Sequence, residues 1–107
     1  MNKTALLYEI IPLDSYENEL AEIIEYLSEQ ASYKVPLKLI EDIESQFDIV
    51  STLPFIYPAY GPKPRFRKMP VNSWQYVIFY TVNKQRREIS LVHIFHTSRD
   101  IHSMMKQ

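Results

Sequence analysis

Three basic side chains that could contact a phosphate lie close together in the second half of the sequence. Arg65, Arg67 and Lys68 fall in a segment where polar and apolar residues alternate, as in a β-strand. Alternation would place Arg65 and Arg67 on one face, and an arginine fork can bind a phosphate through two hydrogen bonds. The alternative is that these charges protect an edge strand from aggregation.

Two histidines lie in the last apolar run. His96 stands at its end, where an imidazole with an ordinary pKa near 6.5 could take or give a proton near neutral pH. His93 alternates with Leu91 and Phe95, which favours a packed residue of the sheet. With no cysteine and three histidines in total, the sequence predicts no metal site and no other cofactor.

The elements that must position these residues begin with a strand and two helices. Residues 5–11 form an apolar run that Pro12 should end. A helix capped by Asp14 or Ser15 should follow, and a second should begin near residue 32 or 33, with Pro36 in its first turn. Both helices carry apolar residues at helical spacing: Tyr16, Leu20, Ile23, Ile24 and Leu27 in the first, and Leu39, Ile40, Ile43, Phe47 and Val50 in the second.

The second half predicts strands. Residues 53–64 hold four prolines and the only glycine, so we expect a loop there. Strands at 65–69, 76–82 and 89–95 should follow, the last two joined by a turn at 83–87, with a short helix near the end. The expected fold is α+β: a small, mostly antiparallel sheet in the order β-α-α-β-β-β, with the helical hairpin on one face and the other face free to carry function.

Length and composition limit the class of protein. The 107 residues fit one domain, with no apparent signal peptide or membrane span, and the lack of cysteine suits the cytoplasm. The net charge of −1 hides an asymmetry. Residues 1–50 carry eleven acidic and three basic side chains, whereas residues 51–107 carry nine basic and two acidic ones. The second half would therefore suit an acidic partner or a polyanion, unless the acids only form a solvated helix surface.

The second half also resembles a known family. Its pattern is similar to that of RelE/ParE toxins of bacterial toxin-antitoxin pairs, and the helical hairpin and Leu53–Tyr57 also fit. The matching segments are Phe66–Val71, Tyr76–Asn83, Ile89–His96 and Arg99–Asp100. The chain departs from the family at Thr97, where relatives often have glycine, and at His93, where many have arginine.

The resemblance implies a toxin, and the function that we expect from it is that of the ribonuclease branch: a ribosome-dependent, metal-independent endoribonuclease that cuts mRNA and so inhibits translation. In that interpretation Arg65 and Arg67 stabilise the phosphate, His96 is the acid or base, and Arg99 supports them. Lys68, Tyr80 and His93 would then contact RNA, with Tyr80 stacking on a base. Tyr80 could instead be a core residue, and Arg99 and Asp100 could instead cap the last helix.

Two other readings of the resemblance remain open. In a ParE-like toxin the same fold inhibits DNA gyrase by binding, without catalysis, and the tail at 101–105 resembles that branch. A family member could also have lost activity and only bind its antitoxin. In each case the resemblance implies a cognate antitoxin as partner.

Overall fold

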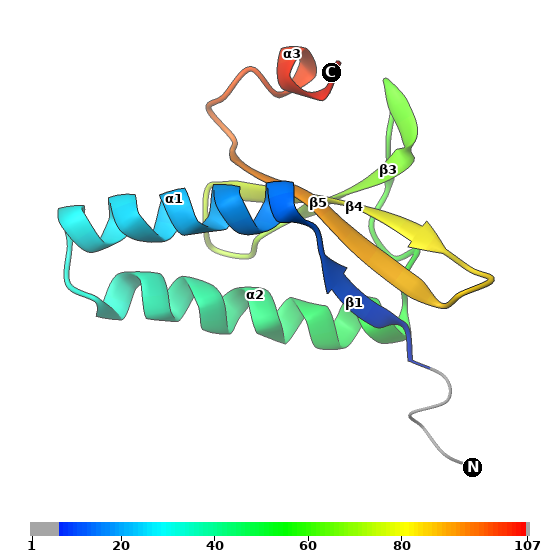
Figure 1. Cartoon of the computed structure of the whole chain (residues 1–107), viewed down its shortest axis with the longest axis horizontal. Helices are drawn as coiled ribbons and strands as arrows, with labels where there is room; N and C mark the ends of the chain where they lie inside the picture. The colour runs from blue at the N-terminus through cyan, green and yellow to red at the C-terminus, as the bar shows by residue number, and fades with distance from the viewer. Residues whose placement is uncertain (1–6, 107) are drawn as a thin grey trace.

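A computed structural model describes residues 7–106 of the chain (Figure 1). Its helices and strands follow one another as β1 (Glu9–Pro12), α1 (Asp14–Gln30), α2 (Lys34–Thr52), β2 (Ala59–Tyr60), β3 (Lys63–Pro70), β4 (Tyr76–Asn83), β5 (Glu88–His96) and α3 (Ile101–Met105). The α+β class, the helical hairpin and the short last helix are confirmed. Residues 5 and 6 of the expected first strand lie outside the described residues.

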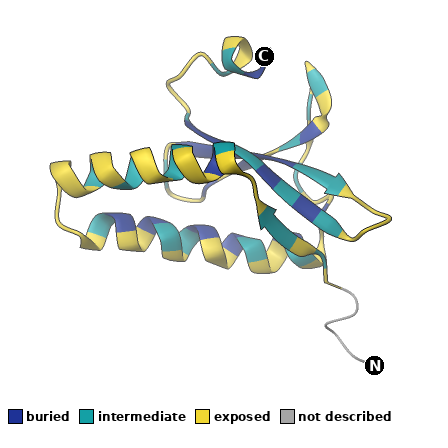
Figure 2. Cartoon of the chain, in the orientation of Figure 1, coloured by how far each residue is buried: buried dark blue, intermediate teal, exposed yellow. Residues whose placement is uncertain are grey.

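The two long helices form where the apolar periodicity predicts them. They lie side by side, and α2 turns one stripe of buried residues inward (Figure 2). That stripe consists of Pro36, Leu39, Ile43, Gln46 and Val50. Its spacing of three and four residues matches the helical repeat, and Pro36 lies in the first turn, where its missing N–H costs no helical hydrogen bond.

The five strands form one sheet in the order β1-β5-β4-β3-β2. β1 pairs with β5 in parallel, because the helical hairpin carries the chain back before the antiparallel strands begin. The strand was expected to end before Pro12, and it ends one residue later, at Pro12 itself, which an edge strand tolerates. The expectation of a loop over residues 53–64 is wrong in part. Ala59–Tyr60 form the short strand β2, which pairs with β3, and β3 already starts at Lys63.

Side chains of α1 cover the edge of β5 beyond the end of β1. Ser15 donates its hydroxyl to the carbonyl of Val92, and the Glu19 carboxylate accepts from the N–H of Ile94 at 3.1 Å. These contacts give β5 backbone groups partners that a longer β1 would otherwise supply. They also fix α1 against the end of β5 that carries His96.

The expectation that the opposite face of the sheet is free is wrong. A second apolar cluster fills that face and consists of Phe66, Val77, Phe79, Phe95 and Met105. Met105 belongs to α3, so the last helix folds back over the sheet (Figure 1). Val77 and Phe79 would otherwise expose large apolar side chains to water, and this drives the docking of α3.

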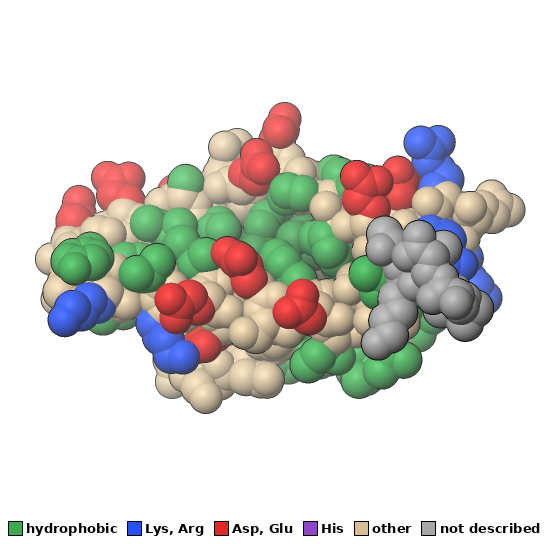
Figure 3. Space-filling model, turned by 90° about the horizontal axis from the view of Figure 1, so that it is seen from below, with side chains coloured by type: hydrophobic (Ala, Val, Ile, Leu, Met, Phe, Trp, Pro, Cys, Tyr) green, Lys and Arg blue, Asp and Glu red, His purple; other side chains and the backbone are tan. Residues whose placement is uncertain are grey.

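Seen from below, the surface carries an apolar band with charges of both signs around it. A band of hydrophobic side chains runs along the molecule with acidic side chains scattered around it (Figure 3). Lysine and arginine side chains gather toward the two ends in this view, where acidic side chains lie beside them.

Candidate functional site

A groove of about 890 Å³ opens at one end of the sheet. Its walls come from α1, the turn between β3 and β4, the end of β5 and α3. The lining residues are Glu19, Glu22, Ile23, Tyr26, Leu27, Ser73, Trp74, Gln75, Tyr76, Ile94, Phe95, His96, Ser98, Arg99 and Met104. Of the residues predicted for a site, His96 and Arg99 lie here.

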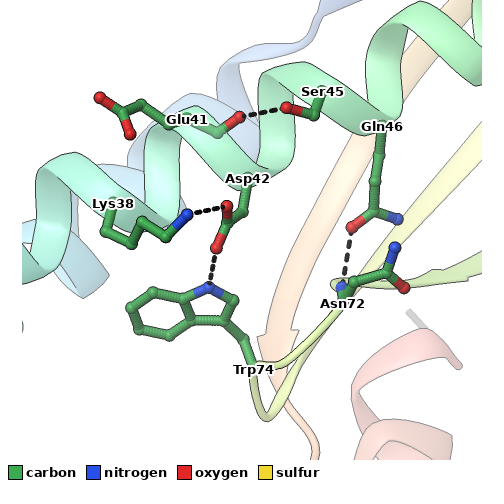
Figure 4. Close-up of polar contacts among 7 residues, drawn as sticks. All are labelled: Lys38, Glu41, Asp42, Ser45, Gln46, Asn72 and Trp74. Atoms are coloured by element: carbon green, nitrogen blue, oxygen red, sulfur yellow. Dashed lines mark hydrogen bonds and ion pairs between the residues drawn. The ribbon is translucent and has the colours of Figure 1, made fainter.

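An indole fixed to α2 forms part of the groove. The Nε1–H of Trp74 donates to Asp42 Oδ2 at 2.8 Å, and Lys38 Nζ lies 2.9 Å from Asp42 Oδ1 (Figure 4). The hydrogen bond from Trp74, followed by that from Lys38, holds the pKa of Asp42 below its ordinary value. The ring of Trp74 lies 6.3 Å from that of Tyr76, so the two rings form one aromatic wall.

The turn that carries Trp74 is held by Gln46, a buried polar residue in the apolar stripe of α2. Its Oε1 accepts from the N–H of Asn72 at 2.8 Å (Figure 4), and its Nε2 donates to the carbonyl of Pro70 at 2.9 Å and to the Tyr57 hydroxyl at 3.1 Å. Sequence reasoning missed Gln46 and Trp74. The signal for Gln46 was a polar residue at a buried helical position between Ile43 and Val50.

His96 is half-buried and partly engaged within the fold. Its Nδ1 accepts from the N–H of Ser98 at 3.0 Å, and its ring meets that of Tyr76 edge to face at 5.3 Å. In the neutral imidazole this leaves the proton on Nε2, the nitrogen that remains for other contacts. Arg99 is exposed beside it and donates its backbone N–H to the His96 carbonyl.

Arg67 is turned toward the segment that follows α2 and not toward the groove. Its Nη1 donates to the carbonyls of Tyr57 at 2.7 Å and Phe55 at 3.3 Å, and its guanidinium lies 4.7 Å from the centre of the Phe55 ring. The guanidinium of Arg65 lies over Phe66 at 4.6 Å. Both arginines therefore have contacts in the fold that do not depend on a phosphate.

The register of the sheet keeps Arg67 apart from His96. Arg67 pairs with Tyr80, whereas His96 pairs with Tyr76, four residues away along β4. This amounts to about 13 Å along the strand and about 10 Å across two strand spacings. General acid-base catalysis needs its groups within hydrogen-bond reach of one reacting phosphate. The described geometry does not bring the predicted phosphate-binding and proton-transfer residues together.

The three residues predicted to contact RNA do not share one face of the sheet. Lys68 and His93 flank Phe79 from the two neighbouring strands on one face, whereas Tyr80 points to the other. Tyr80 is fully buried and donates its hydroxyl to the carbonyl of Pro54 at 2.8 Å, and burial raises its pKa to about 12. Its ring is therefore not at the surface, where stacking on a base would require it. Lys68 is opposite Phe79 in the register and so lies on the other face of the sheet from Arg67 and Tyr80.

His93 is a half-buried residue that links β5 to α1. Its Nδ1 lies 3.0 Å from Glu19 Oε2, and its ring stacks on that of Phe95 at 4.8 Å. Leu91 faces the other side, because β5 has one extra residue at the bulge opposite Phe79 and Tyr80. His93 therefore packs in the sheet as expected, but against Phe95 only and not against Leu91.

The part of the chain that the structure describes has neither a metal-binding cluster nor a membrane-spanning helix. Within residues 7–106, no three His, Cys, Asp or Glu side chains gather in a way that could hold a metal ion. Over the same described range, no helix has both the length and the apolar character needed to cross a membrane.

The sequence and the fold are both similar to those of known toxins. Residues 10–101 match the family model of the ParE toxin of the type II toxin-antitoxin system parDE. A chain of the chromosomal ParDE system from P. aeruginosa has a similar fold, with a TM-score of 0.70 at 15% identity over 84% of this chain and 96% of that chain. A chain of the RelBE2 complex from Mycobacterium tuberculosis aligns with a TM-score of 0.56 at 11% identity over 85% and 92% of the two chains. A search of curated proteins returns no match. Because the family model spans most of the sequence, this chain belongs to the ParE toxin family of type II toxin-antitoxin systems.

Proposed function

We propose that the chain is a toxin that acts by binding DNA gyrase and inhibiting it, without cutting RNA. The observation that carries the proposal is the separation of Arg67 from His96 by the register of β3, β4 and β5. A ribonuclease would need cations and a proton donor around one phosphate. An inhibitor that binds needs only a fixed, complementary surface.

The contacts of the basic residues support this proposal. Arg67 holds the segment after α2 through two carbonyls, and His93 pairs with Glu19. These side chains stabilise the fold, so their presence does not require a catalytic role. The family match to parDE toxins agrees with the gyrase branch of the resemblance.

A titration of purified toxin into a gyrase supercoiling reaction tests the proposal. We expect supercoiling to fall as the toxin approaches the gyrase concentration, with His96→Ala as active as the parent. Undiminished supercoiling at a large excess of folded toxin would refute the proposal.

A ribosome-dependent mRNA endoribonuclease is the second candidate. It is favoured by His96 and Arg99, which share the groove with an aromatic wall of Trp74 and Tyr76. A reconstituted translation reaction, with new 5′ ends of the messenger mapped, distinguishes the two candidates. Ribosome-dependent cuts that disappear with His96→Ala would favour this second candidate.

In either case the partner that restrains the toxin is a cognate antitoxin. Both similar structures come from toxin-antitoxin systems, which supports this partner. Co-purification of the chain with the product of the adjacent reading frame is the expected result. An inactive family member would bind that antitoxin but neither inhibit gyrase nor cut RNA.

A further inference from the structure

The end of α2 and the segment after it expose four large apolar side chains. Leu53 is 53% exposed, Ile56 52%, Phe55 44% and Ile49 43%. Ile49 lies one helical turn before Leu53, and residues 53–56 line a hollow of about 290 Å³. We call these four residues the apolar patch. Isolated exposed apolar residues are common on proteins, but four within eight positions form a contiguous surface.

The backbone beneath the apolar patch is held firmly. The buried hydroxyl of Tyr80 donates to the Pro54 carbonyl, and Arg67 donates to the carbonyls of Phe55 and Tyr57. The Ile56 N–H also bonds to the Leu53 carbonyl. The fold therefore fixes this segment from the sheet side while its apolar side chains face water. A surface fixed in advance loses little conformational entropy when a partner binds.

Cationic side chains surround Phe55. The Arg67 guanidinium lies 4.7 Å from the centre of its ring and the Lys84 ammonium 5.6 Å from it. Lys84 is exposed, at the start of the turn between β4 and β5. An apolar surface with cations at its border complements apolar side chains flanked by carboxylates. A second copy of this chain would fit poorly, because a symmetric contact would bring the same cations together.

We infer that the apolar patch is a docking site for an acidic, amphipathic segment of the cognate antitoxin. The inference rests on membership of the toxin family and not on the choice of gyrase as target. Antitoxin bound here would cover the exposed apolar side chains while the toxin is held inactive. Lys84 and Arg67 would attract the carboxylates of the antitoxin and favour its association at low salt.

The test measures the affinity of the purified toxin for the protein encoded by the adjacent reading frame, at low and high salt. The variant Leu53→Ser/Ile56→Ser should weaken binding by about 30-fold or more, because two exposed apolar anchors are lost. The matched control Tyr33→Ser/Leu37→Ser changes residues that are 71% and 49% exposed at the other end of α2. It should change the affinity by less than about threefold.

A second variant keeps the test decisive if the serine variant unfolds. Lys84→Glu alters an exposed turn residue, and it should weaken binding at low salt and reduce the dependence of affinity on salt. Affinities of both variants equal to the parent would overturn the docking site, whatever the gyrase assay shows. Failure of the parent to inhibit gyrase would remove the proposed target and leave this result unchanged.

Discussion

At the scale of single residues, several side chains that were predicted to contact a phosphate or RNA instead make contacts within the fold. Arg67 was predicted to bind a phosphate, yet it binds the carbonyls of Phe55 and Tyr57. Those carbonyls lie ten and twelve residues earlier, in a proline-rich segment whose path no periodicity describes. Sequence could locate the cationic residue but not its acceptors.

Arg67→Ala should destabilise the protein. It removes two hydrogen bonds from a charged donor and the contact with Phe55, so we expect a loss of about 2 kcal/mol in the free energy of unfolding. Urea denaturation of the variant and the parent measures this difference in the free energy of unfolding. Arg65→Ala is the control. It removes a guanidinium that lies over the Phe66 ring, and it should lower the free energy of unfolding by less than about 1 kcal/mol. Equal effects of the two changes would contradict the structural role of Arg67.

Asp42 should link pH to the environment of Trp74. Its folded-state pKa is lowered, so its stabilising contact is present above the ordinary value of 3.8 and is lost as pH falls through the lower folded value. Trp74 is the only tryptophan, so its fluorescence reports the change. We expect a transition with a midpoint below 3.8 that is absent in Asp42→Asn. Far-ultraviolet circular dichroism on the same samples separates it from unfolding.

At the scale of elements, periodicity was sufficient for the helices and the last two strands. Leu39, Ile43 and Val50 repeat at helical spacing and are buried as expected. The pairing of Ala59–Tyr60 with β3 could not be predicted, because prolines on both sides of so short a strand hide its pattern. The covered back face was also missed, although Ile101, Met104 and Met105 in the tail were an available apolar signal.

Met105→Ala tests the docking of α3 on the sheet. Met105 is only 3% exposed and belongs to the same apolar cluster as Phe79 and Phe95. The cavity left by its truncation should lower the free energy of unfolding by about 2 to 3 kcal/mol. Met104→Ala, at a half-buried neighbour, should cost clearly less. A negligible effect of Met105→Ala would show that α3 does not cover this face in solution.

At the scale of the whole molecule, the sheet separates two regions that the sequence suggested as one site. The groove with His96 and Arg99 lies at one end, whereas Arg67 lies at the apolar patch, two strands away and four residues further along. Sequence reasoning could place each residue on a strand. It could not place them relative to one another, because the strand order and the β5 bulge depend on pairing between distant segments.

Supercoiling by purified gyrase, measured against increasing toxin, tests most directly whether the toxin acts on gyrase by binding. We predict complete inhibition near equimolar toxin, equal inhibition by His96→Ala, and relief when the antitoxin is added first. Full supercoiling in the presence of excess toxin, with ribosome-dependent cuts in a messenger under matched conditions, would contradict gyrase inhibition.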